Sequence, residues 1–154
     1  MNKGFSLIEL LVVVAIIGIL SAAGVVAYNG FIDSSRSSCA MMNHENMVEV
    51  SQTTQITCSM QSSITLLDKR GNQVSRSCSQ PPNQWDGYMR DHFVGSGYKS
   101  CDGQNTPMPI GKFHGNPPVG QSYYAADNTA NWPFYIKTCF SINNCQQNIV
   151  YWAP

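Results

Sequence analysis

The sequence predicts an α+β protein: a long N-terminal helix, a small antiparallel β-sheet and a loop-rich C-terminal region stapled by disulfides. Three observations predict it, namely an apolar stretch of membrane length, short strand-like segments between turn signals, and six cysteines among 154 residues. We expect a transmembrane or assembly helix over residues 5–32 and a globular head over residues 33–154. The second half of the helix is expected to pack on this head.

The apolar stretch runs from Leu10 to Ile32 without a charged residue. At ~1.5 Å per residue, a helix of this length crosses the ~30 Å hydrocarbon core of a bilayer. Lys3 precedes the stretch and the next basic residue is Arg36. The positive-inside rule therefore keeps the N-terminus in the cytoplasm and puts the head on the other side of the membrane.

Glu9 is the only charged residue between Gly4 and Ile32. A charge buried in a bilayer costs ~2.5–3.5 kcal/mol on insertion scales. A secretory signal cut after residues 21–23 leaves Glu9 unexplained and exposes an apolar new N-terminus at Gly24. A plain membrane anchor leaves Glu9 unexplained as well.

The stretch GFSLIELLVVVAIIGIL closely resembles the N-terminal segment of type IV pilins and pseudopilins. The resemblance extends to about Ile32 and implies a leader of residues 1–4. It also implies cleavage between Gly4 and Phe5 by a prepilin peptidase, N-methylation of Phe5, and Glu9 as the characteristic fifth residue of the mature chain.

The resemblance implies a structural subunit, the major pilin, of a type IV pilus. Such a subunit is anchored in the inner membrane before assembly. Inner-membrane machinery then polymerises it into an extracellular, homo-oligomeric helical filament. Glu9 is expected to pair with the Phe5 amine of a neighbouring subunit, because removing one partner of a buried pair costs ~3–5 kcal/mol. The simpler interpretation places Glu9 in the lipid headgroup region.

Two alternatives to a major pilin stay open. The first is a minor pilin or a type II secretion pseudopilin, and the second is a membrane-anchored secreted binding protein or enzyme. One departure from the family is Val26, which stands where many members carry proline. Gly18 and Gly24 are then the weak points of the helix, each costing up to ~1 kcal/mol relative to alanine.

Beyond the membrane, the helix is expected to continue and to end between Val50 and Gln55, in a polar run. At 100° per residue, one stripe is expected to face the head. It comprises Cys39, Met42, Met47 and Val50.

Strand-like segments follow, with Ile64–Leu67 leading into a hairpin turn at Asp68–Asn72. Phe134–Phe140 and Ile149–Trp152 are the other candidates. Proline and glycine are dense between Ser79 and Pro133, which predicts ordered loops there rather than long regular elements. The late aromatic residues are expected to form a small core and subunit contacts.

The cysteines predict a disulfide framework made in an oxidising compartment, because they include no C-x-x-C pair and the histidines lack ligand spacing. The preferred pairs are Cys139–Cys145, Cys39–Cys58 and Cys78–Cys101. The first closes a turn at Asn143-Asn144 and resembles the C-terminal disulfide loop of pilins. The second requires the helix to break by Val50. Six cysteines allow 15 connectivities.

Charge and motifs exclude several classes of function. Nine basic residues balance nine acidic ones, so there is no basic field to attract nucleic acid. The chain has no G-x-S-x-G, phosphate-loop or H-E-x-x-H motif, and His44, His92 and His114 show no nucleophile partner. We expect no enzyme, cofactor or metal. Asp86-Gly87 and Asp102-Gly103 lack calcium-loop spacing and are expected to be ordinary turns.

Overall fold

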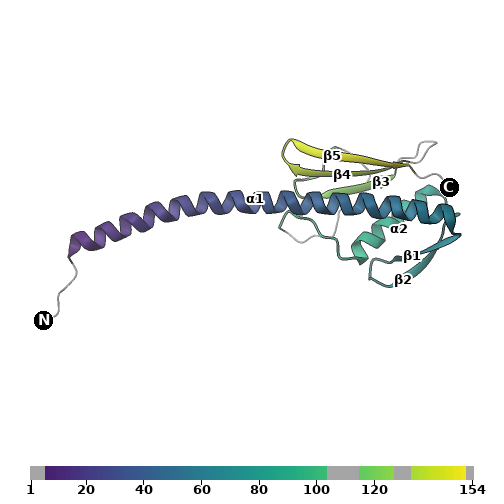
Figure 1. Ribbon diagram of the computed structural model, residues 1–154, viewed down its shortest axis with the longest axis horizontal. Coiled ribbons are helices and arrows are strands. Elements are labelled where there is room, and N and C mark those ends of the chain that lie inside the picture. The colour runs from purple at the N-terminus through teal and green to yellow at the C-terminus, as the bar shows by residue number, and fades with distance from the viewer. Residues whose placement is uncertain (1–5, 104–114, 127–132, 152–154) are drawn as a thin grey trace. The chain divides into compact units, whose positions relative to one another are not determined.

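The computed structural model describes residues 6–103, 115–126 and 133–151. Its elements, drawn in Figure 1, are α1 (Leu7–Met60), β1 (Ser63–Leu67), β2 (Gln73–Ser77), α2 (Pro82–Gly95), β3 (Ser122–Ala126), β4 (Pro133–Ser141) and β5 (Asn144–Tyr151). The architecture is α+β, as predicted, but it contains two small antiparallel sheets, β1-β2 and β3-β4-β5. The chain divides into two compact units, Met1–Ser35 and Arg36–Pro154.

In the second unit, α1 packs through one narrow face. The buried residues of that face recur every three or four positions, as expected for a helix that buries one stripe. They are Ala40, His44, Met47, Ser51 and Thr54. The predicted stripe was right for Met47 and wrong for Met42, which is exposed. Small and polar residues, rather than methionines alone, therefore make the contact with the head.

The predicted end of α1 was wrong, because the helix continues to Met60. The Ser51 hydroxyl donates to the carbonyl of Met47 at 2.7 Å, and the Thr57 hydroxyl donates to that of Thr53 at 2.8 Å. These bonds to the preceding turn satisfy the hydroxyls within the helix. The polar run therefore forms part of the packing face and does not end the helix.

Helix α2 was not predicted. Trp85, Met89 and Phe93 lie one turn apart along it and are buried in the main core with residues of β1, β3 and β4. Pro82 begins the helix, where a missing N–H costs little. The Asp86-Gly87 pair therefore lies inside a helix and is not the turn expected from sequence.

The hairpin of β1 and β2 was predicted correctly, with Leu67 opposite Gln73 and the turn at residues 68–72. Strand β4 coincides with the predicted segment Phe134–Phe140. Strand β5 begins at Asn144, five residues before the predicted segment Ile149–Trp152, and Trp152 lies outside the described residues. Strand β3 was not predicted and pairs antiparallel with β4. The β3-β4-β5 sheet buries Tyr124, Phe134 and Ile136 on one face.

The structure contains the expected Cys139–Cys145 disulfide, between directly opposed residues of β4 and β5. The other two preferred pairs were wrong. The structure joins Cys39 to Cys101 and Cys58 to Cys78. Cys39 and Cys58 both lie on α1, which puts them ~28 Å apart at ~1.5 Å per residue, far beyond disulfide reach.

Candidate assembly site

The start of α1 places Glu9 against the main chain that precedes the helix. The Ser6 amide donates to Glu9 Oε2 at 2.9 Å, and the helix begins at Leu7. Ser6 and Glu9 therefore occupy the first and fourth positions of an S-x-x-E capping box, in which the glutamate accepts from the capping residue's amide. A carboxylate in the first turn is also stabilised by the helix dipole, by ~0.3–1 kcal/mol.

This capping bond leaves Glu9 able to accept further bonds. An ionised carboxylate has about four acceptor positions, of which the Ser6 amide occupies one. The side chain is exposed in the single chain. The geometry therefore holds one negative charge at the N-terminal end of an apolar helix, with room for a cationic partner.

The apolar residues behind Glu9 are exposed along the first half of α1. Apart from the half-buried Ile32, the large ones expose roughly half or more of their surface: Leu7, Ile8, Leu10, Leu11, Val12, Val13, Val14, Ile16, Ile17, Ile19, Leu20, Val25, Val26, Tyr28 and Phe31. Burying such a side chain gains ~1.5–3 kcal/mol. Within the described residues, α1 alone is long and apolar enough to cross a membrane. This surface is suited to a bilayer or to other apolar helices.

The glycines of this segment do not break the helix, which is continuous through Gly18, Gly24 and Gly30. A Cβ atom added at any of the three would meet nothing within 4 Å. Contacts within the chain therefore do not require glycine at these positions. Any close packing that does require it must come from other molecules.

The structure places Glu9 beside Ser6, whose capping role the sequence analysis missed although the S-x-x-E spacing indicates it. Gly4 and Phe5, the predicted cleavage and methylation residues, lie outside the described residues.

A buried polar network ties α1 to the β3-β4-β5 sheet, and sequence reasoning missed it. His44 Nε2 donates to Asn148 Oδ1 at 2.8 Å, and His44 Nδ1 lies 2.9 Å from Thr138 Oγ1. The Thr138 hydroxyl in turn donates to Ser122 Oγ at 2.7 Å. A histidine beside a hydroxyl is the arrangement of an activated nucleophile. Here Thr138 is 0% exposed, so no substrate reaches it and the network is structural.

Other groups in the head also have structural roles. The described residues contain no group of three side chains suited to a metal ion. Asp102 accepts hydrogen bonds from Ser100 and Gln121, which hold the Asp102-Gly103 turn. Burial raises the pKa of Asp86, and the nearby Arg90 charge partly offsets that rise. His114 lies outside the described residues.

Comparison with known proteins extends the interpretation of the N-terminal segment. Residues 1–25 match the family model of the prokaryotic N-terminal methylation motif. The type IV major fimbrial protein FimA of Dichelobacter nodosus is 57% identical over 37 residues, which are 24% of this chain and 23% of that protein. A relative from the same organism, named fimbrial protein, matches to the same extent. No solved structure matches the chain.

The matched region spans about a quarter of the relatives' length (23%). The family-model match, residues 1–25, includes the start of α1. The chain carries the N-terminal motif of type IV prepilins, and its architecture is pilin-like, with a long apolar helix, small antiparallel sheets and disulfides. That family consists of structural pilins rather than enzymes.

Proposed function

We propose that this chain is the major structural subunit of a type IV pilus. The observation that carries the proposal is the single carboxylate of Glu9, held at the start of an exposed apolar segment of α1 that has no other charged residue up to Ile32. The motif match at residues 1–25 and the fimbrial names of the relatives support it. Before assembly, the apolar helix anchors the subunit in the inner membrane with its N-terminus in the cytoplasm.

Processing creates the partner of Glu9. A prepilin peptidase cuts between Gly4 and Phe5, and methylation of the new N-terminus leaves a cationic amine on Phe5. In the filament, the apolar helices pack together and the Phe5 amine of one subunit pairs with Glu9 of another. An alignment of neighbouring helices that separates the two charges is unfavourable, because burying an unpaired charge costs free energy.

Glu9 variants separate charge pairing from helix capping. Glu9→Gln keeps an oxygen that can accept the Ser6 amide but removes the charge, whereas Glu9→Ala removes both. We expect both variants to be inserted, cleaved and methylated, and both to lose surface filaments. Immunoblots of the membrane and sheared-filament fractions measure this outcome.

Glu9→Asp retains the charge in the first turn and serves as the control, with partial assembly expected. Normal filaments from Glu9→Gln together with their loss in Glu9→Ala would assign Glu9 to capping alone. Abundance separates a major subunit from a minor pilin or pseudopilin. The major subunit should dominate purified filaments, and a trace amount would make this chain a minor one.

A further inference from the structure

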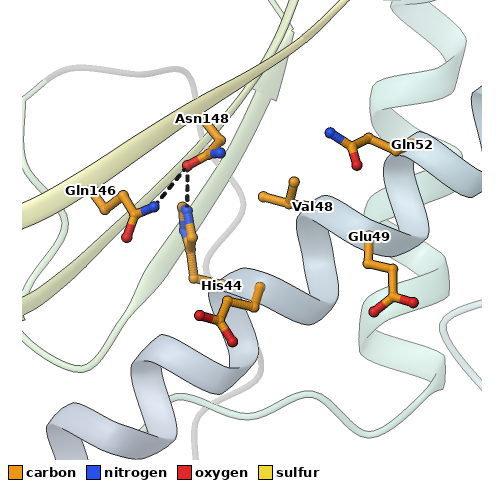
Figure 2. A pocket seen from close by; sticks show the side chains of 7 residues that line it. His44, Val48, Glu49, Gln52, Gln146 and Asn148 are labelled. Carbon is orange, nitrogen blue, oxygen red and sulfur yellow. Dashed lines mark hydrogen bonds between the residues drawn. The ribbon is translucent and has the colours of Figure 1, made fainter.

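A small groove in the head lies between α1 and β5. His44, Val48, Glu49 and Gln52 of α1 form one side, and Gln146 and Asn148 of β5 form the other (Figure 2). Glu45 completes the lining. Its volume of about 230 Å³ is below the ~300–1,000 Å³ of small-molecule sites, so it suits one or two side chains rather than a metabolite.

Two acidic side chains, Glu45 and Glu49, line the groove. Glu45 and Glu49 are exposed and lie four residues apart on α1, an arrangement in which like charges destabilise a helix. No lysine or arginine occurs between Arg36 and Lys69, so no cation of the helix faces them one turn away. The last turn of α1 also contains no basic residue to offset the negative end of the helix dipole.

A second surface of the head carries the complementary charge. The tip of the β1–β2 hairpin exposes Lys69 and Arg70. Asp68 turns its carboxylate inward, accepting from the amide of Arg70 at 2.8 Å and from that of Asn72 at 2.9 Å. Its other oxygen accepts from the Asn72 side chain at 3.0 Å. These hydrogen bonds hold the turn together. They also occupy the carboxylate of Asp68, the acidic residue next to Lys69.

We propose that the Glu45/Glu49 groove receives the Lys69-Arg70 hairpin tip of a neighbouring copy of this chain. The two glutamates are ~6 Å apart along the helix axis, a spacing that two adjacent long cationic side chains can match. The hairpin and the β3-β4-β5 sheet lie on different sides of α1 (Figure 1). Two complementary patches on different sides of one molecule form a head-to-tail contact, which generates a helical filament when it does not close.

The proposal rests on the proposed filament function and adds a specific contact between heads. Charge pairs at the rim of an interface affect the association rate and the alignment of the two partners more than they affect the binding affinity. Amide side chains at the groove, such as that of Gln52, supply further acceptors for a lysine or arginine. The contact therefore selects one stagger of neighbouring heads.

Charge reversal in the full-length protein tests the contact. Glu45→Lys with Glu49→Lys, and separately Lys69→Glu with Arg70→Glu, should each reduce sheared surface filaments by about tenfold or more. The quadruple variant restores complementary charges and should recover assembly. Asn46→Lys with Thr53→Lys adds two charges at exposed positions of α1 outside the groove and should assemble normally.

Each result decides the proposal. Loss in both double variants with recovery in the quadruple variant supports it, provided that all chains accumulate equally in the membrane. Normal filaments from either double variant, or a quadruple variant that fails like its parents, overturns it. A wild-type chain that enters no filament contradicts the proposed function itself and not only this contact.

Discussion

At the scale of single residues, two histidines have defined structural partners. His44 joins α1 to β4 and β5 through Thr138 and Asn148. His92 on α2 accepts the amide of Leu67, the last residue of β1, on Nδ1 at 3.1 Å. A ring nitrogen that accepts a hydrogen bond carries no proton, so this contact requires neutral His92. Burial lowers the pKa of His92, in the direction that this contact requires.

The contact of His92 makes the head sensitive to acid. The unfolded chain takes up a proton near the ordinary histidine pKa of ~6.5, whereas folded His92 resists protonation to a lower pH. The stabilisation is therefore present above ~6.5 and is lost as the pH falls through the lowered pKa. In denaturant melts of the Arg36–Pro154 unit, His92→Gln should show a smaller loss of unfolding free energy between about pH 7 and pH 5. Parallel pH curves for the two proteins would contradict this.

At the scale of elements, the sequence was most informative where a pattern had a single interpretation. The length of the apolar stretch predicted a helix, and the Asp68–Asn72 turn after the strand-like run Ile64–Leu67 predicted the β1–β2 hairpin. Directly opposed cysteines across the β4–β5 turn were likewise predictable. These features depend on local sequence, so tertiary contacts were not needed to infer them.

The misses arose where tertiary packing outweighed local propensity. The polar run around Thr53-Thr54 suggested a helix end between Val50 and Gln55, but Ser51 and Thr54 are buried against the head and α1 continues to Met60. That error carried over to the pairing of Cys58. The density of proline and glycine predicted loops where α2 lies. Trp85, Met89 and Phe93 recur every four residues and are buried, a spacing that indicates a helix.

Two glycines of α2 should respond in opposite directions to the same substitution. A Cβ at Gly95 would overlap the carbonyl oxygen of Asp68, whereas one at Gly87 would meet nothing within 4 Å. Gly95→Ala should lower the unfolding free energy by ~1–3 kcal/mol. Gly87→Ala should raise it by ~0.5–1 kcal/mol by favouring the helix. Chemical denaturation of both variants measures the difference, and equal shifts would contradict the packing of α2 on the hairpin turn.

At the scale of the whole molecule, the disulfides differ in the length of chain they close. The pairs Cys39–Cys101, Cys58–Cys78 and Cys139–Cys145 have sequence separations of 62, 20 and 6. In the chain-entropy model these loops correspond to ~4, ~3 and ~2 kcal/mol of stability. The long bridge ties α1 to the loop region, so it constrains far more of the unfolded chain than the C-terminal hairpin does.

Replacing each cysteine pair by alanine should therefore lower the melting temperature of the head in that order, with the Cys39–Cys101 variant affected most. Reduction of all three should lower it by tens of degrees. Thermal melts of the Arg36–Pro154 unit with and without reductant provide the comparison. A melting temperature that does not change on reduction would show that the disulfides do not stabilise the head.

Under the proposed function, the chain is a processed pilin that assembles into filaments. Intact-mass analysis of sheared surface filaments tests it most directly. We expect a chain that begins at Phe5, carries one added methyl group and lacks six hydrogens, two for each of the three disulfides. A chain that begins at Gly24, as simple secretion requires, or filaments that lack this chain would contradict it.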